Sequence, residues 1–289
     1  MTNKIDLHLH STASDGTMSP SELADYAKES GITVAAITDH DTVDGAEEFL
    51  AECEKIGITG VAGVEISADY ECEMHVLGLF VDHKNAELNN MLKRLRNSRY
   101  ERNVKMIERL NEAGIDISEA DITGQKENGT LYDTGRAHFA AAIVNKGYVK
   151  SKKEAFSEYL GNDAPCYVPR FKLSPEMCAG MIQYAGGIAV LAHPFAITHK
   201  KRVLDELLAQ IKEWGFDGVE AYHSSHSTTF NSRCLELAPK HGLVITGGSD
   251  FHAANKPDVP IGIVNKGSGT VPYELYEQII EYRGLSETR

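Results

Sequence analysis

The sequence predicts an α/β protein with a mostly parallel sheet, interrupted by a mostly helical segment. Short apolar runs of strand length alternate with amphipathic helical stretches over residues 4–85 and again after Pro169, the pattern of a parallel sheet covered by helices. Between them, residues 86 to about 165 follow a helical period alone. With 289 residues, 42% of them hydrophobic, the chain is long enough for one large core with an insertion, or for two domains.

The first part of the chain predicts a β-α-β-α-β order. A helix is expected to begin at residues 19–22 (Ser-Pro-Ser-Glu), because a serine cap, a proline in the first turn and a glutamate three residues after the cap form a helix-start pattern. Gly31 ends this helix, and Asp44 opens a second helix that ends near Gly57. Strands are expected at residues 4–9, 33–38, 58–66 and 74–81.

The middle segment differs from its surroundings in period and in charge. Apolar residues from Leu88 to Leu110 recur at helical spacing. Residues 86–170 carry 14 Lys and Arg against 12 Asp and Glu, whereas the remainder of the chain carries 15 against 30. Such a shift in charge marks a domain boundary. We therefore expect one domain made of residues 1–85 and 171–289, with a helical insert between them.

The alternation of strands and helices returns after the insert. A Ser-Pro-Glu pattern at residues 174–176 starts a helix, and three further helices are expected at residues 203–214, 231–241 and 273–282. Strands are expected at residues 188–192, 217–222 and 243–247, with a last short one at 261–264.

Charge, hydropathy and cysteine content exclude several classes of protein. A net charge of −13 excludes a generally basic nucleic-acid coat and disfavours binding to an anionic membrane. No apolar run approaches the roughly 20 residues that span a bilayer. The five cysteines are scattered and form no C-x-x-C pair, so neither a disulfide framework nor a zinc knuckle is indicated. We expect a cytoplasmic protein with no membrane partner and no obligate protein partner.

Histidines and acidic residues follow the predicted strands. His8 and His10 stand two apart at the end of the first strand, so their side chains share one face. Most members of this set lie where parallel strands end, the edge at which a barrel gathers its catalytic side chains. So many imidazoles and carboxylates at one mouth call for multivalent metal ions as counter-charge. The set has nine members: His8, His10, Asp15, His40, Glu65, His75, His193, Asp250 and His252.

Three aspartates near these residues have simpler interpretations. Asp41 and Asp44 are expected to be helix caps. Asp39 is expected to orient a metal ligand rather than to be one.

The residues around the nine side chains form motifs that carry a family resemblance. In order and spacing they resemble the motifs of the PHP (polymerase and histidinol phosphatase) family, over about residues 3–85 and 172–270. The resemblance implies a distorted (β/α)7 TIM-like barrel with a metal cluster at its carboxyl mouth. The motifs are Asp6-Leu7-His8-Leu9-His10-Ser11 with Asp15-Gly16, Thr38-Asp39-His40-Asp41, Gly63-Val64-Glu65, His75, Ala192-His193-Pro194 and Gly248-Ser249-Asp250-Phe251-His252.

The same resemblance implies how the ligands are shared among two or three divalent metals. The first metal takes His8, His10, Glu65 and Asp250; the second takes Glu65 as a bridge with His75 and His193; the third takes Asp15, His40 and His252. Asp15 stands where many members have a histidine, so an oxygen replaces a nitrogen at the third position. A shell of nitrogen and oxygen without sulfur suits manganese, iron or zinc, and we favour manganese.

Two motifs of the insert narrow the resemblance. Thr134-Gly135-Arg136-Ala137-His138 and Tyr167-Val168-Pro169-Arg170 resemble the insert of a branch that includes nucleoside 3′,5′-bisphosphate phosphatases, an AMP phosphatase and a 5′-to-3′ exoribonuclease. This implies that the insert recognises the substrate, a small phosphorylated nucleotide. Arg136 is the first candidate for a phosphate clamp and Arg170 the second.

The resemblance implies hydrolysis of a phosphate monoester on a nucleoside 3′,5′-bisphosphate or monophosphate, by a hydroxide that bridges the first two metals. The leaving oxygen then needs a proton, from His223 or from water on the third metal. His138, His223 and Ser224 are further candidate donors to the substrate. His226 is another candidate donor, but a solvated loop histidine is the preferred interpretation.

Other functions remain open at this point. A 5′-to-3′ exoribonuclease acting on short RNA would use the basic stretch at residues 93–109 on the RNA backbone, although a solvated helix face explains that stretch equally simply. Histidinol phosphate is another possible monoester. A non-catalytic module of a polymerase is disfavoured by the complete set of ligands, and an amide hydrolase by the lack of a lysine in any motif.

Overall fold

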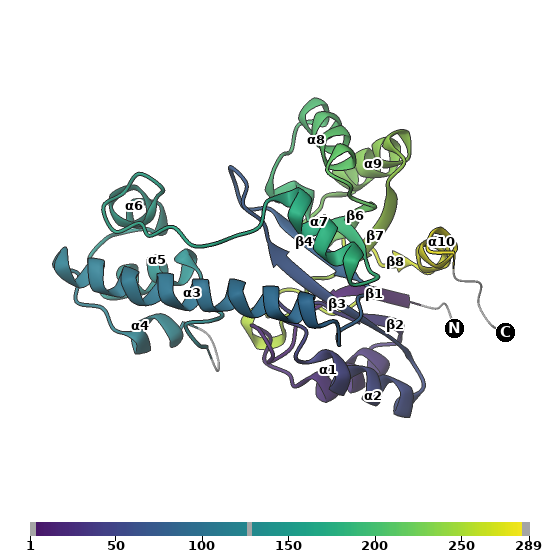
Figure 1. Cartoon of the computed structure of the whole chain (residues 1–289), viewed down its shortest axis with the longest axis horizontal. Coiled ribbons are helices and arrows are strands. Elements are labelled where there is room, and N and C mark those ends of the chain that lie inside the picture. Colours follow the sequence, from purple (N-terminus) through teal and green to yellow (C-terminus); the bar gives the residue numbers. More distant parts are fainter. Residues whose placement is uncertain (1–3, 126–128, 285–289) are drawn as a thin grey trace. The chain divides into compact units, whose positions relative to one another are not determined.

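Figure 1 shows the computed structural model of the chain, which describes residues 4–125 and 129–284. The chain divides into two compact units. The barrel unit comprises Met1–Asn90 and Lys172–Arg289, and the helical unit comprises Met91–Phe171. The boundary falls within a long helix, α3 (Ala86–Glu112). No helix in the described part of the chain has both the length and the apolar character needed to cross a membrane.

The barrel unit is built on one sheet, in which the described residues form eight strands in the order β7-β6-β5-β4-β3-β2-β1-β8. An isolated parallel bridge joins Leu9 of β1, the last strand but one in this order, to Phe251 just after β7, the first strand, and nearly closes the barrel. The strands are β1 (Lys4–Leu9), β2 (Ile32–Ile37), β3 (Thr59–Ser67), β4 (His75–Leu79), β5 (Ile188–Leu191), β6 (Gly218–His223), β7 (Val244–Gly248) and β8 (Val271–Pro272).

The sheet is less parallel than the sequence predicts, because β4 runs antiparallel to both β3 and β5, and β8 runs antiparallel to β1. The connection from β3 to β4 is too short for a parallel crossover, which needs a dozen or more residues. This reversal has a consequence for the site. His75 is the first residue of β4 and pairs with Ser67, the last residue of β3, so it lies at the carboxyl end of its neighbour.

Helices follow the strands and pack against the sheet. The predicted start of α1 (Pro20–Glu29) is confirmed, because the Ser19 side chain accepts from the Glu22 N–H and the Glu22 carboxylate accepts from the Ser19 N–H. The other helices of this unit are α2 (Ala46–Ile56), α7 (Pro175–Tyr184), α8 (Lys201–Glu213), α9 (Thr228–Leu237) and α10 (Glu274–Tyr282), with short 3₁₀ turns at Pro194–Ala196, Ala238–His241 and Ala253–Asn255.

Three local predictions for this unit are wrong. Gly45, not Asp44, is the N-cap of α2, and it makes no side-chain cap. Asp41 is no cap either: its carboxylate accepts from the Ser67 N–H, which ties the loop after β2 to the end of β3. Residues 261–264 are not a strand, because Gly262 has a left-handed φ of +71° and its N–H donates to Asp6.

The helical unit has an apolar core of its own, which includes Met106, Leu110, Phe139 and Ile143. Its main helix is α3, whose buried side chains recur at helical spacing. The remaining elements are α4 (Glu119–Thr123), α5 (Arg136–Asn145), α6 (Lys152–Ala155) and a π-helical turn at Phe156–Leu160.

Candidate metal centre

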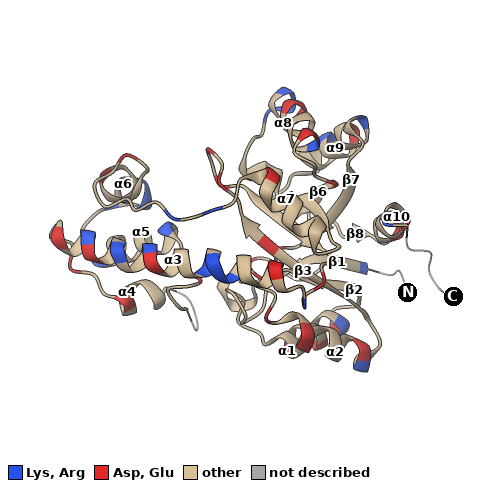
Figure 2. Cartoon of the chain, viewed as in Figure 1, with Lys and Arg blue, Asp and Glu red and all other residues tan. Residues whose placement is uncertain are grey.

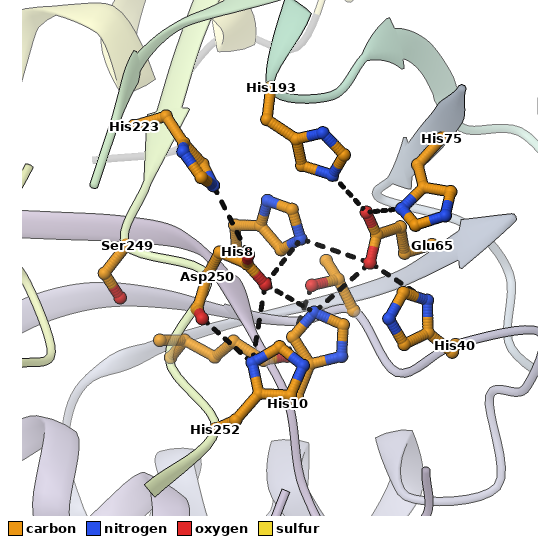
Figure 3. A network of polar contacts seen from close by, with 12 residues as sticks. His8, His10, His40, Glu65, His75, His193, His223, Ser249, Asp250 and His252 are labelled. Carbon is orange, nitrogen blue, oxygen red and sulfur yellow. Dashed lines mark hydrogen bonds and ion pairs between the residues drawn. The ribbon is translucent and has the colours of Figure 1, made fainter. Parts of the chain in front are cut away.

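Histidine and acidic side chains from six strands and the loops that follow them meet at one end of the barrel unit (Figure 3). β1 carries His8, and His10 is the first residue after the end of this strand. Alternation along this strand sends Ile5 and Leu7 to the apolar core and His8 to the opposite face. The structure brings together all nine side chains in the set that the sequence singles out.

Glu65, near the end of β3, lies at the centre of the cluster and is 1% exposed. Its Oε1 lies 2.9 Å from both His75 Nδ1 and His193 Nε2. Its Oε2 faces a different set of imidazole nitrogens, at 3.0, 3.3 and 3.4 Å: those of His40, His10 and His8. Each carboxylate oxygen therefore faces its own group of imidazole nitrogens. This is the arrangement expected of a carboxylate that two cations share.

Asp250 completes the group around His8 and His10. Its Oδ1 lies 3.7 Å from His8 Nε2 and 3.4 Å from His10 Nε2. With Glu65 these residues form a buried group whose ligand atoms all lie within 4.8 Å of one another. Asp250 has a positive φ of 61°, an unfavourable backbone conformation of the kind that clusters at functional sites.

A neighbouring group gathers around Asp15. Asp15 Oδ1 lies 3.1 Å from His252 Nε2 and 3.5 Å from His10 Nδ1, and its Oδ2 lies 3.9 Å from His40 Nε2. The loop that carries Asp15 is held by Asp39, whose carboxylate accepts from the Ser11 N–H and hydroxyl at 2.8 and 2.6 Å. Asp39 therefore positions the loop, which agrees with the orienting role expected of it.

The close approach of β7 to β1 depends on Gly248. A Cβ atom at this position would lie 2.3 Å from the Cβ of His8 and 2.5 Å from its backbone nitrogen. No side chain fits there, so glycine lets the strand that leads to Asp250 lie against the strand that carries His8.

Unsatisfied buried atoms test whether metal ions fit this site. Burying a polar atom without a partner costs free energy, so such atoms are rare in folded proteins. Here they cluster, and all are nitrogen or oxygen atoms of the kind that bind manganese, iron or zinc. The buried atoms that lack a hydrogen-bond partner in the described part of the chain include His8 Nε2, His10 Nδ1 and Nε2, His40 Nδ1, Glu65 Oε2 and His252 Nε2. The donor set thus fits divalent cations.

In His8 and His252, the hydrogen bond made by Nδ1 determines that Nε2 is the nitrogen left for a metal ion. His8 Nδ1 lies 2.9 Å from Glu220 Oε1, and His252 Nδ1 lies 2.8 Å from the carbonyl oxygen of Asp250. Both neighbours are acceptors, so both rings carry their proton on Nδ1. The Nε2 lone pairs of His8 and His252 then face the cluster, the arrangement typical of metal-binding histidines.

Electrostatics of the cluster agree with a set of ligands. Burial alone would raise the pKa of Glu65, but the surrounding imidazoles of His40, His75 and His8 hold it well below its ordinary value. Burial lowers the pKa of His40 to about 3, so this ring is neutral and its lone pair is available. Glu65 is thus an anion at neutral pH, and the neutral His40 ring has a nitrogen lone pair that can bind a metal ion.

Glu220 is a residue of the site that the sequence prediction missed. It is fully buried in β6, and besides the contact with His8 its Oε2 accepts from the His193 N–H at 2.8 Å. It therefore holds one residue from each of two groups of candidate ligands. Its signal in the sequence is a lone acid in an otherwise apolar strand, Gly218–His223.

Lys256, which lies outside every motif, also reaches the cluster. Its Nζ lies 2.7 Å from Asp250 Oδ2. Burial by itself would raise the pKa of Asp250, but Lys256 and His252 hold it well below its usual range. The contact is an ion pair with the Asp250 carboxylate.

The predicted substrate-binding residues fall in both units. In the barrel unit, His223 Nε2 lies 3.4 Å from Asp250 Oδ2. Ser224 follows it, and the carbonyl oxygen of Ser224 accepts from the Lys266 N–H. The sequence interpretation of His226 is wrong: its side chain is fully buried, its Nδ1 bonds the Ala221 carbonyl oxygen at 2.7 Å, and it packs on Phe230.

The other three predicted residues lie in the helical unit. Arg136 Nη1 donates to the Leu160 carbonyl oxygen at 3.1 Å and to Asn162 Oδ1 at 2.8 Å. His138 Nδ1 accepts from the Gly135 N–H at 3.0 Å, which caps α5. Arg170 is half-buried near the end of the unit.

Comparison with known proteins gives consistent relatives. A family model described as PHP domain matches residues 6–163. A 5′-3′ exoribonuclease of Haemophilus influenzae is 34% identical over 257 residues, which cover 87% of this chain and 91% of that protein. A 3′,5′-nucleoside bisphosphate phosphatase of Chromobacterium violaceum is 34% identical over 259 residues, which cover 89% of this chain and 90% of that protein.

A solved structure from Bifidobacterium adolescentis, described as a metal-dependent phosphoesterase, has a TM-score of 0.76 and 30% identity over 99% of this chain and 98% of that chain. The barrel fold, the buried donor set and these relatives agree with one another, and they identify a phosphoric ester hydrolase that uses divalent metal ions. Since the family model spans more than half of its residues, the chain belongs to the PHP domain family.

Proposed function

We propose that this chain hydrolyses a phosphate monoester of a small nucleotide, a nucleoside 3′,5′-bisphosphate or a nucleoside monophosphate. The observation that carries the proposal is the position of Glu65, whose two oxygens face separate groups of imidazoles. Glu65 in this position would help to hold two cations, which would together neutralise the charge of a phosphoryl group.

The ligand assignment is the one that the family resemblance implies, and contacts among the members of each group support it. His8, His10, Glu65 and Asp250 hold the first cation; Glu65, His75 and His193 hold the second; Asp15, His40 and His252 hold the third. His40 Nδ1 lies 3.0 Å from Glu65 Oε2, the oxygen that also faces His8 and His10, and its Nε2 lies 3.9 Å from Asp15 Oδ2, so His40 lies between the first and third groups. We propose manganese as the resident metal, because the set mixes imidazole with carboxylate and has no thiolate.

The metals supply a nucleophilic water near neutral pH and neutralise charge on the phosphoryl oxygens. The chain's own residues prepare the rest. Glu220 holds the His8 ring with its proton on Nδ1, and Gly248 lets β7 bring Asp250 close to it. The loop held by Asp39 brings Asp15 to His252.

His223 is the candidate donor of a proton to the leaving oxygen. The Ser225 N–H donates to His223 Nδ1 at 3.1 Å, so Nδ1 is an acceptor and the ring carries its proton on Nε2. That Nε2 points toward Asp250 in the cluster (Figure 3) and has no hydrogen-bond partner in the described residues. The position suits a hydrogen bond from Nε2–H to the leaving oxygen. To give up a proton as a general acid, the ring must first be the imidazolium, with Nδ1 protonated as well, because proton loss from the neutral ring would leave an imidazolate.

The nucleotide as substrate is supported by the relatives and by the chemistry of the helical unit. We propose that this unit recognises the substrate through arginines, which suit phosphate because of their fork of donors. Ribonuclease activity on short RNA is a second candidate, supported by the relative from Haemophilus influenzae. Figure 2 shows that α3 carries both basic and acidic residues along its length.

A substrate panel tests the proposal. The manganese-loaded chain is assayed with adenosine 3′,5′-bisphosphate, AMP, histidinol phosphate and a 5′-phosphorylated short RNA, and kcat/KM is compared. The highest value is expected for one of the two mononucleotides. A highest value for the RNA would replace the proposal by the exoribonuclease, and no turnover of any phosphate ester would refute both.

A further inference from the structure

The two carboxylate oxygens of Asp250 face partners of different kinds. Oδ1 lies 3.4 Å from His10 Nε2 and 3.7 Å from His8 Nε2, the imidazoles of the first ligand group. Oδ2 instead lies 2.7 Å from Lys256 Nζ and 3.4 Å from His223 Nε2. Both of these nitrogens carry protons, so Oδ2 faces donors of hydrogen bonds. Asp250 therefore turns one oxygen toward candidate metal ligands and the other toward N–H groups.

Glu65, the other acid of the first ligand group, has no such division. Its two oxygens both face imidazole nitrogens, and no lysine or arginine forms an ion pair with it among the described residues. A lysine on one oxygen is therefore particular to Asp250. The Lys256 side chain is 40% exposed, against 12% for Asp250, so its ammonium group keeps part of its contact with water and needs no second anion.

The turn that carries Lys256 is tied to the loop of another candidate ligand. Asn255 Nδ2 donates to the carbonyl oxygen of Asp15 at 2.8 Å, and the Ala254 N–H donates to Thr17 Oγ1 at 3.1 Å. A lysine side chain loses much rotamer freedom when it is held in one conformation. Because the backbone of this turn is already fixed at the site, less freedom remains to be lost when Lys256 contacts Asp250.

We propose that Lys256 is a positioning residue that holds Oδ2 of Asp250 away from the first metal, so that Asp250 binds this metal through Oδ1 alone. The proposal rests on the proposed function, in which Asp250 is a ligand of the first metal. A carboxylate can bind a cation through one oxygen or through both, and the second oxygen takes a further coordination position. A catalytic metal needs an open position for water or substrate. Lys256 thereby keeps that position available.

Lys256 in this role opposes metal binding while it supports turnover. Its positive charge repels a cation bound at Oδ1, and its hydrogen bond draws negative charge toward Oδ2. A lysine that only held its turn in place would have the opposite effect on metal binding, because its loss would loosen Asp250. The sign of the change in metal affinity therefore separates the two roles.

Calorimetric titration of the metal-free chain with manganese measures this sign. K256M removes the ammonium group at similar length, and K201M, which removes a lysine paired with Glu236 outside the cluster, is the matched control. K256M is expected to bind its first manganese at least about tenfold more tightly than the wild type, because a nearby positive charge and a competitor for Asp250 are both lost. K201M should bind like the wild type.

Two further variants of Lys256 guard this titration against a folding defect. K256R keeps a charged donor for Oδ2 and should return manganese affinity toward that of the wild type. K256Q, which is neutral, takes the place of K256M if K256M does not fold, with the same expected gain in affinity. Unchanged or weaker manganese binding by the neutral variant would overturn the proposal.

Crystal structures of the manganese-loaded chain test the number of bound oxygens directly. In the wild type, the first manganese is expected to bond one oxygen of Asp250. In K256M it is expected to bond both. Two bonded oxygens in the wild type, or a single one in K256M, would overturn the proposal.

Turnover of p-nitrophenyl phosphate separates positioning from contact with the substrate. At saturating manganese, K256M should lower kcat by about tenfold or more with little change in KM, because the open position is filled. A higher KM with unchanged kcat and unchanged manganese affinity would make Lys256 a substrate contact and overturn the proposal. If the wild type hydrolysed no phosphate ester, the proposed function would fail, whereas tighter manganese binding through both Asp250 oxygens in K256M would still establish the positioning role.

Discussion

The two units bury charge in opposite ways. In the barrel unit, carboxylates and imidazoles face one another across short distances, and Glu65 alone lies within 3.4 Å of five histidines. In the helical unit, Arg102 is buried with its Nε unpartnered and with no carboxylate among its hydrogen-bond or ion-pair partners in the described residues. Each arrangement is incomplete, because buried polar atoms in both units lack partners.

The difference agrees with the roles proposed for the two units. A cluster of lone pairs and carboxylates is completed by cations, and a buried guanidinium is completed by an anion. A hydrolase for a doubly phosphorylated nucleotide has use for both. The comparison can be tested unit by unit, because a change in one should leave the other function in place.

The largest effect is expected from Asp250→Ala in the barrel unit. It removes a charge and a donor from the group that contains His8 and His10, so at least one metal equivalent and more than about a hundredfold in kcat should be lost. Elemental analysis and turnover of p-nitrophenyl phosphate measure both. Asp205→Ala, which removes an acid that pairs with His241 outside the cluster, is the control and should keep full metal content. Retention of all metal in Asp250→Ala would contradict the assignment.

Glu220→Gln should have the next largest effect, although Glu220 is not assigned as a metal ligand. The amide keeps the size of the side chain but weakens its hold on the His8 Nδ1 proton, so manganese affinity should fall about 10–100-fold. A calorimetric titration with manganese measures the change, and Glu220→Asp should restore part of the affinity if the carboxylate matters. A lower Tm with unchanged manganese affinity would show that Glu220 has a purely structural role.

The residues of the barrel site could be located from the sequence because their positions are local. A histidine pair such as His8 and His10 at the end of a strand, or Glu65 at the end of another, is visible without knowing how the strands pair. The direction of β4 was missed, although the short connection of residues 68–74 is typical of a hairpin. Glu220 was missed because it lies inside an apolar strand, where a periodic pattern assigns no function.

The helical unit was harder to interpret because burial decides the role of a charged residue there. Between Lys93 and Arg109 the sequence shows seven basic residues that look alike, and only the fold distinguishes Arg102 from its exposed neighbour Lys105. The prediction for His226 was wrong for the same reason. It packs against Phe230, four residues further on, and against Phe195, which comes from a distant part of the chain.

Arg136→Ala is expected to act on substrate choice and leave the metal cluster intact. The kcat/KM for adenosine 3′,5′-bisphosphate should fall about tenfold to a hundredfold, with metal content unchanged and p-nitrophenyl phosphate much less affected. Because Arg136 also bonds Leu160 and Asn162, the Tm of the variant should be checked first. Equal losses on both substrates would place Arg136 at the reacting phosphate, and no loss on either would leave it a structural residue.

The smallest effect concerns a charge pair that is already complete. In the helical unit, Lys146 Nζ lies 2.8 Å from Asp121 Oδ2, and this contact, with the Ser118 hydroxyl, lowers the pKa of Asp121 to about 2. The pair is partly exposed, so its contribution to the free energy of unfolding should be at most about 1 kcal/mol. A depressed carboxyl pKa stabilises the fold above the ordinary pKa of 3.8, and this contribution is lost as pH falls through about 2. Asp121→Asn should therefore lower the Tm slightly at pH 7, and the difference from the wild type should shrink between pH 4 and pH 2.

Asp163→Asn, which changes an exposed acid of the same unit, should show no such convergence. A constant difference down to pH 2 would contradict the assignment, because it would show that the effect of the substitution does not depend on the charge of Asp121.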